Sequence, residues 1–170
     1  MTSSPTISVI DDGSHHMGSL TAHRPLWASH GAGGSILSWM QHCLDRPLQG
    51  VAVCGQEDVL QPSGPTSAVR LMVSARWMEP DPALLPEVGE HVISEDGVLL
   101  AAHAEEEILQ AWRNGDVAKV LHATTPKVVK VRTLDAPWDL LDLLHHALGR
   151  RVANMTSTPV PSGVHVLGDA

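Results

Sequence analysis

The stretch ISVIDDG, Ile7–Gly13, sets the fold expectation for this chain of 170 residues. Its first four residues, ISVI, are rich in β-branched side chains, which favours a short buried strand. The following Asp11-Asp12-Gly13 is a turn signal. Because ligands of α/β sheets bind outside the carboxyl ends of the strands, the two aspartates stand where a binding site would form.

Strand and helix patterns alternate beyond this stretch. Ser35 is an expected N-cap, and the apolar residues of 36–44 follow it at helical spacing. The sequence further predicts strands at 51–54 and 69–73, a helical turn within 81–86, a hairpin over 91–103, a short helix over 104–115 and an edge strand over 127–134. The alternation predicts an α/β fold in one domain, with a mixed sheet flanked by helices.

The last helical pattern lies in residues 135–155. Asp135 is expected to cap this helix, and Pro137 to lie in its first turn. An apolar stripe at helical spacing is the expected core-facing side, and it consists of Leu141, Leu144, Leu148 and Val152.

The composition limits the classes of partner. The net charge is -8 with histidine neutral, which argues against nucleic acid because phosphate neutralisation needs clustered lysine and arginine. Two cysteines, neither in a CxxC arrangement, indicate a reducing compartment. Neither a signal-peptide pattern nor an apolar run of membrane-spanning length is evident. The expected protein is therefore cytoplasmic, with no membrane partner.

Two carboxylates, one arginine and a pair of glycines carry the candidate chemistry. Asp11 and Asp12 could hold Mg²⁺, which takes oxygen ligands, or could form only a turn. Arg24 is the one Arg or Lys among the first 45 residues. It could clamp a phosphate or pair with an aspartate at the surface. Gly33 and Gly34 precede the capped helix and could cradle a phosphate or form a flexible loop.

The histidines do not predict a metal site. The adjacent pairs His15-His16 and His145-His146 lack the spacing of zinc ligands, since neighbouring residues on a strand or helix point in different directions. The sequence also has no signature of a nucleophilic triad or of a phosphate-binding P-loop.

Several short motifs, taken in order, resemble one known family. They are the pair Asp11-Asp12, LTAHRPL at 20–26, the helix start Ser35-Ile36, APWDLLDL at 136–143 and GVHVLGDA at 163–170. Their order is similar to that in the N-terminal domain of a sugar nucleotidyltransferase group, relatives of the bifunctional N-acetylglucosamine-1-phosphate uridyltransferase/glucosamine-1-phosphate acetyltransferase. The motifs are short and span most of the chain, so their joint order carries the resemblance.

The resemblance implies a Rossmann-like, nucleotidyltransferase-type sheet over residues 1–155. Residues 156–170 would be a linker and strand leading toward a left-handed β-helix domain beyond residue 170. The implied reaction transfers a nucleotidyl group from an NTP to a sugar 1-phosphate, with Mg²⁺ as cofactor. The implied partners are these two substrates, and a homo-oligomer is compatible with this function. The implied site has Asp11 and Asp12 on the metal, Asp12 and Arg24 in catalysis, and Leu20, Thr21, Arg24, Gly33 and Gly34 on the substrate.

One departure from the family supports an alternative function. His30 stands where members of this group carry a second arginine, six residues after the arginine of the Arg-Pro pair. Imidazole is only partly charged at neutral pH and cannot form the bidentate contacts of a guanidinium. The alternative is a catalytically silent nucleotidyltransferase-like domain that acts as a structural or assembly module. Whether the chain is an enzyme is therefore left open by its sequence.

Overall fold

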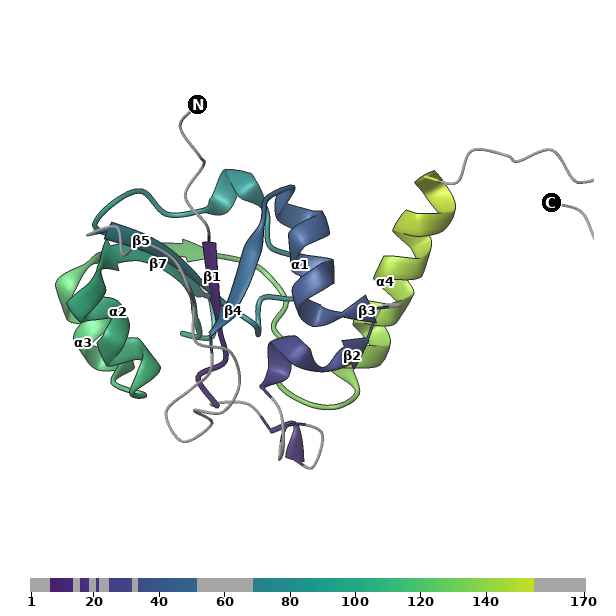
Figure 1. The fold of residues 1–170 in the computed structure, drawn as a ribbon, viewed down its shortest axis with the longest axis horizontal. Coiled ribbons are helices and arrows are strands. Elements are labelled where there is room, and N and C mark those ends of the chain that lie inside the picture. Colours follow the sequence, from purple (N-terminus) through teal and green to yellow (C-terminus); the bar gives the residue numbers. More distant parts are fainter. Residues whose placement is uncertain are drawn as a thin grey trace, which may run out of the picture.

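The structure, a computed structural model, describes residues 7–13, 16–18, 21, 25–31, 34–51 and 69–154. Over these residues a six-stranded sheet has the order β4-β1-β5-β7-β6-β8 (Figure 1). Its strands are β1 (Ile7–Ile10), β4 (Leu48–Val51), β5 (Val69–Ser74), β6 (Glu90–Ser94), β7 (Leu99–Glu105) and β8 (Thr125–Val129). A small ladder joins β2 (His30–Gly31) to β3 (Gly34–Ser35).

Three of the α-helices lie between strands in the chain, and the fourth follows β8. The α-helices are α1 (Ile36–Leu44), α2 (Glu106–Arg113), α3 (Val117–Ala123) and α4 (Asp139–Asn154). Two short 3₁₀ helices, η2 (Leu26–Ala28) and η3 (Pro82–Leu84), lie in loops. No helix of the described ranges is long and apolar enough to span a bilayer.

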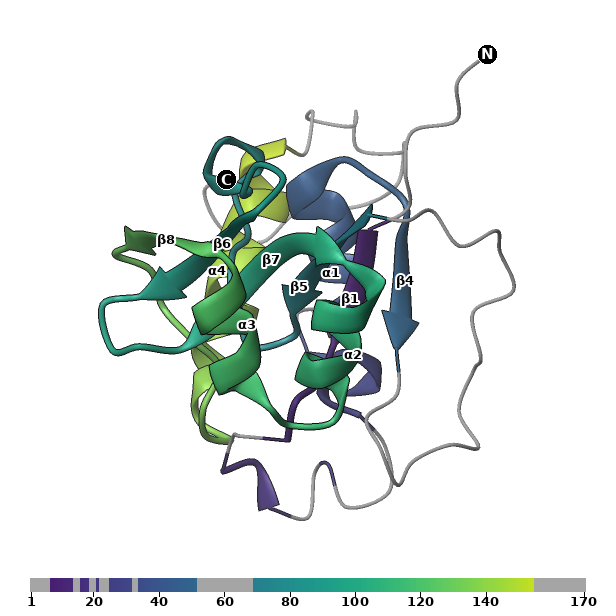
Figure 2. The same cartoon turned by 90° about the vertical axis from the view of Figure 1, so that its left-hand side faces the viewer.

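The strand directions place β1 at the centre of a parallel group. β1 is parallel to β4 on one side and to β5 on the other, so Val9 pairs with both Gly50 and Val73. β7 runs antiparallel to β5 and β6, whereas β8 is parallel to β6 and forms one edge of the sheet (Figure 2). The chain thus passes from β1 to a neighbour on one side and later returns on the other side. The carboxyl end of β1 is consequently a topological switch point, where open α/β sheets bind ligands.

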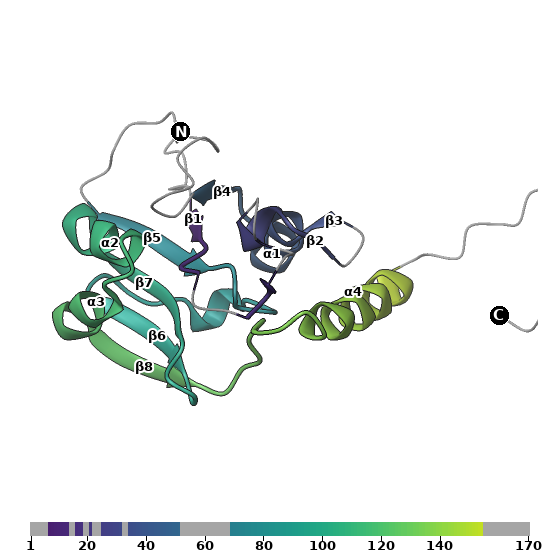
Figure 3. The ribbon, with the colours of Figure 1, turned by 90° about the horizontal axis from the view of Figure 1, so that it is seen from below.

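Helices cover both faces of the sheet (Figures 1 and 3). α2 and α3 lie on one face, and their Leu109, Trp112 and Val120 pack with Ile10 of β1. α1 lies on the other face, where the second core cluster includes Ile7 and Val9. Successive residues of a strand point to opposite faces, so the ISVI run supplies both cores. The mixed sheet flanked by helices confirms the α/β prediction.

Most of the predicted elements are confirmed. β1, the hairpin of β6 and β7, helix α2, the turn at η3 and the edge position of β8 match the sequence pattern. The range predicted for the edge strand is wrong, because β8 ends at Val129 and residues 130–134 lie outside it. The Ser35 side chain caps α1 by accepting a hydrogen bond of 3.1 Å from the Ser38 N–H. β4 begins at Leu48, earlier than expected, and residues 52–54 of the predicted strand lie outside the described residues.

The core-facing side predicted for α4 is wrong. Leu141, Leu148 and Val152 are exposed, whereas Leu143 and Ala147 are fully buried in the core. α4 carries apolar residues on two sides, and helical periodicity alone cannot tell which side packs. The expected cap is also wrong, because α4 begins at Asp139, whose own carboxylate accepts the N–H groups of Asp135 and Ala136 at 2.8 Å.

A buried histidine in β6 predicts acid sensitivity of the fold. His91 is 2% exposed, and its Nδ1 lies 2.7 Å from the hydroxyl of Thr124. That hydroxyl donates to the Val120 carbonyl, so the imidazole Nδ1–H is the donor to the hydroxyl oxygen. Burial lowers the pKa of His91 from its usual 6.5, although the contact with Thr124 opposes the shift. The unfolded chain therefore binds a proton at a higher pH than the folded chain.

We expect the free energy of unfolding to fall as the pH drops below about 6.5, toward the lower pKa of folded His91. Urea unfolding across that range should show a smaller fall for His91→Gln, which can still hydrogen bond Thr124. The same change at exposed His122 is the matched control. Equal pH slopes in all three proteins would show that His91 does not cause the acid sensitivity.

Candidate functional site

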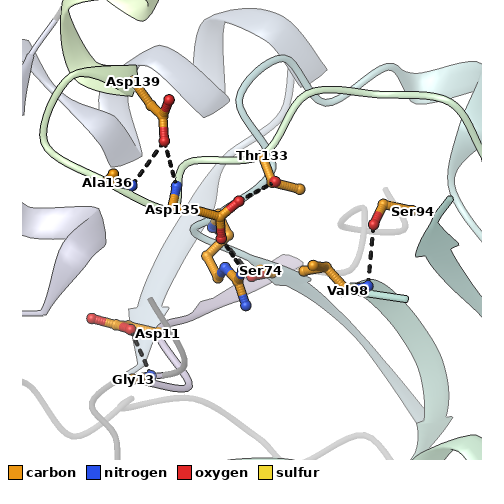
Figure 4. A network of polar contacts seen from close by, with 10 residues as sticks. Asp11, Gly13, Ser74, Ser94, Val98, Thr133, Asp135, Ala136 and Asp139 are labelled. Atoms are coloured by element: carbon orange, nitrogen blue, oxygen red, sulfur yellow. Dashed lines mark hydrogen bonds and ion pairs between the residues drawn. The ribbon is translucent and has the colours of Figure 1, made fainter. Parts of the chain in front are cut away.

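The Asp11 carboxylate joins the end of β1 to a distant loop. Asp11 is 4% exposed, and its two oxygens accept backbone N–H groups from Gly13 at 2.9 Å and from Leu26 at 2.5 Å. Figure 4 shows the bond to Gly13. A carboxylate that accepts two N–H groups holds both segments in place and satisfies donors that burial would otherwise leave unpaired.

The bond to Leu26 connects two motifs of the sequence resemblance. It brings the end of the LTAHRPL run against the aspartate pair, across 15 residues of sequence. Pro25 is buried at this junction, and Leu26 begins η2. Thr21 donates its hydroxyl to the Gly18 carbonyl at 3.4 Å. Leu20 and Arg24 lie outside the described residues, so their predicted roles stay predictions.

Gly34 has a packing role in the structure. It pairs with Gly31 in the ladder of β2 and β3, just before α1. A Cβ atom at Gly34 would come within 2.6 Å of the Ser38 Oγ, which donates a hydrogen bond to the Ser35 carbonyl. Rotation of the Ser38 side chain would relieve this contact, so the contact alone does not require glycine here, and a substrate contact by Gly34 remains a prediction. Gly33 lies outside the described residues.

The end of β5 lies next to the end of β1 and adds an arginine. The Ala75 N–H donates to the Ile10 carbonyl at 2.7 Å, so the segments that follow β1 and β5 leave the sheet side by side. Arg76 follows, and its guanidinium is nearly buried in an ion pair with Asp135. Arg76 was not among the site residues predicted from the sequence. It could have been found because Arg76 lies three residues after the predicted strand 69–73, and carboxyl ends of parallel strands share one edge.

Asp135 connects the loop before α4 to this edge. Its carboxylate accepts hydrogen bonds from the Thr133 hydroxyl and from Arg76, and its carbonyl accepts the His16 N–H at 2.6 Å. Partial burial raises the pKa of Asp135, but the hydrogen bonds from Thr133 and Arg76 and the positive charge of Arg76 outweigh burial and hold the pKa below its usual value. Asp135 is therefore a stable anion paired with Arg76.

Three segments of the resemblance thus meet at the switch point. The aspartate pair, the loop starting at Pro25 and the turn before α4 converge through backbone and carboxylate contacts around Asp11 and Asp135. His30, in contrast, lies exposed on the ladder of β2 and β3, opposite Ser35. The convergence defines the switch-point site: Asp11, Asp12, Leu26, Arg76 and Asp135.

The aspartates fit a magnesium ion only in part. Both oxygens of Asp11 accept backbone N–H groups, whereas Asp12 is half-buried at the strand end. Mg²⁺ is commonly held by one or two carboxylates together with water and substrate phosphates. Within the described part of the chain, no group of three His, Cys, Asp or Glu side chains could hold a metal. Metal binding by Asp11 and Asp12 stays a prediction.

No protein-family model matches the chain, and no curated protein matches it.

Proposed function

We propose that this chain is a sugar nucleotidyltransferase-like domain that transfers a nucleotidyl group from an NTP to a sugar 1-phosphate. The observation that supports the proposal is the meeting of the acidic pair with the LTAHRPL run at the carboxyl end of β1, through the Asp11–Leu26 hydrogen bond. Parallel β1, β4 and β5 with helices on both faces agree with the implied Rossmann-like sheet.

The proposed reaction forms one bond and breaks one bond. A phosphate oxygen of the sugar 1-phosphate attacks the α-phosphorus of the NTP, and the bond to the bridging oxygen of the β-phosphate breaks. The products are a nucleotide sugar and pyrophosphate. Little covalent work falls to the protein, which must position the phosphates and stabilise their charge.

The residues divide this work in the proposal. Asp12 would hold Mg²⁺, which when bound supplies positive charge to the phosphates. Arg24 would contact the phosphate oxygens, where a guanidinium forms two parallel hydrogen bonds. Asp11 would act as a positioning residue, because its carboxylate fixes the loop that follows Arg24 and Pro25.

Isothermal titration tests the proposal with the intact chain, a panel of NTPs and Mg²⁺. We expect one NTP to bind with Mg²⁺, and Asp12→Asn to weaken this binding by about tenfold or more, or about 1.4 kcal/mol. Arg24→Ala should weaken binding with and without the metal. Asp96→Asn, at an exposed turn, is the matched control. Absence of binding at millimolar NTP, or equal binding by wild type and Asp12→Asn, would contradict the proposal.

A second function has its own observation in the site. The charges of Asp11 and Arg76 are satisfied within the protein, by backbone N–H groups and by Asp135. Such internal pairing suits a catalytically silent domain that keeps the fold as a structural or assembly module. The same titration separates the two functions, because a silent domain binds no NTP while its thermal unfolding remains cooperative.

A further inference from the structure

The outer side of α4 carries a continuous row of exposed side chains. The row consists of Trp138 just before the helix, then Leu141, His145, Leu148 and Val152, and we call it the α4 face. Its four apolar members are 68%, 60%, 47% and 67% exposed, in chain order. The described part of the chain has two other large exposed apolar residues, Val88 in the turn before β6 and Val128 in β8. Exposed apolar side chains are therefore concentrated on one helix.

The spacing of the α4 face specifies the kind of surface it fits. The steps between its members are three, four, three and four residues. This is the a and d spacing of the heptad repeat, which keeps one seam of a helix facing another helix. Trp138 to Val152 spans about 21 Å at the helical rise per residue, which is three turns or more of contact. The partner expected for this surface is a helix packed along α4.

The other side of α4 is already fixed to the body of the protein. Leu143 and Ala147 are fully buried, and Arg150 lies over the Trp39 ring of α1 at 5.6 Å from its centroid. Arg150 also lies 3.7 Å from a carboxylate oxygen of Glu79. Figure 3 shows α4 extending away from the sheet, beside the ladder of β2 and β3. The α4 face is thus held rigidly, and it needs no rearrangement to receive a partner.

The charges around the α4 face favour a second copy of this chain. At its middle, Asp142 pairs with Arg132, and the Arg132 guanidinium lies 3.4 Å from the His146 ring nitrogen. These residues form a rim of both charge signs beside the α4 face. A two-fold axis near His145 would bring the rims of the two copies together, with Asp142 of one copy near Arg132 of the other. A two-fold interface must be complementary to itself, and a row of apolar side chains with both signs beside it meets that requirement.

The size of the face agrees with a dimer. Its apolar side chains expose on the order of 400 Å² per copy, in the range of the largest patches on soluble proteins. Burying this area on both copies, together with the charged rim, gives about 1,000 Å², the lower limit for a specific interface. A dimer of micromolar rather than nanomolar stability is the expected result.

We infer that the α4 face is a homodimer interface, in which α4 packs antiparallel against α4 of a second copy. The antiparallel direction follows from the charges of the helix. A two-fold axis near His145 that brings Asp142 beside Arg132 of the other copy reverses the direction of the second helix, and opposite directions also place the positive end of one helix dipole beside the negative end of the other. The interface is separate from the switch-point site and does not depend on nucleotide transfer.

Sedimentation equilibrium of the intact chain tests the dimer over about 1–300 μM, a range that brackets micromolar affinity. Wild type should pass from monomer to dimer, and Leu141→Glu and Leu148→Glu should each remain monomeric over the whole range. Both side chains are exposed, so these variants should keep the thermal unfolding midpoint of the monomer. Val128→Glu is the matched control and should dimerise as wild type does.

Cysteine cross-linking tests the direction in a background with Cys43 and Cys54 replaced by alanine. In the antiparallel dimer, the cysteine of His145→Cys lies near the two-fold axis. On mild oxidation it should form a disulfide with the same position of the second copy. Val152→Cys should not form a disulfide, because residue 152 of one copy and residue 152 of the other lie at opposite ends of the interface. A monomeric wild type at all concentrations would overturn the dimer. Efficient cross-linking of both variants would overturn the antiparallel arrangement.

Discussion

Asp11→Ala is expected to lower the free energy of unfolding by about 2–4 kcal/mol, the largest single effect at the switch-point site. The variant leaves the Gly13 and Leu26 N–H groups without the acceptor that the buried carboxylate provides. Asp11→Asn should recover only part of the loss, because an amide offers one oxygen where the structure uses two. Urea unfolding at neutral pH measures both effects.

The control for this result is Asp96→Ala, at an exposed turn residue, which should change stability by less than about 0.5 kcal/mol. If Asp11→Ala is as stable as the control, then its carboxylate does not hold the loop at Leu26. The role of Asp11 as a positioning residue would then be wrong. The titration of Asp12→Asn would be unaffected by that outcome, so the two proposals fail separately.

Asp135→Ala is expected to cost about 2–3 kcal/mol, because it leaves the nearly buried Arg76 guanidinium without its carboxylate. The value lies below that of a fully buried pair because the Asp135 side chain is 40% exposed to solvent. The double variant Arg76→Met with Asp135→Ala should be more stable than Asp135→Ala alone, since the nearly buried charge that has lost Asp135 is removed as well. A double-mutant cycle from urea unfolding gives the coupling directly.

The lowered pKa of Asp135 adds a pH dependence to this prediction. The ion pair stabilises the folded chain fully above the ordinary aspartate value of 3.8, and its contribution is lost as the pH falls below that value. This window begins at a lower pH than the window expected for His91, which begins near 6.5. Additive effects of Arg76→Met and Asp135→Ala, with no coupling, would contradict the proposed pairing.

Local patterns predicted the elements that depend on neighbouring residues. The β-branched ISVI run, the Ser35 cap and the turn at Glu95-Asp96-Gly97 each specify local structure through their own backbone preferences. Gly97 has a φ of +80°, a conformation that favours glycine after such a turn. α3 and the ladder of β2 and β3 were not predicted, because both are short and only tertiary packing makes them stable.

The site was less accessible to sequence reasoning because it depends on which strands are neighbours. Arg76 is 65 residues after Asp11 in the sequence (76 minus 11), and the sheet order alone brings their strand ends together. The wrong prediction for α4 has a related origin. Leu143 and Leu148 are equally apolar, and only the position of α1 and the sheet decides that the first is buried and the second exposed.

The central position of β1 has a consequence for synthesis on the ribosome. Both of its neighbours, β4 and β5, come later in the chain, and β5 ends only at Ser74. ISVI therefore leaves the exit tunnel as an apolar segment with both strand edges unpaired. More than 60 further residues must be synthesised before the second edge can pair with β5. Apolar strands whose partners have not yet been synthesised slow folding and are sites of aggregation. Yields of soluble protein should thus depend strongly on chaperones that bind nascent apolar segments.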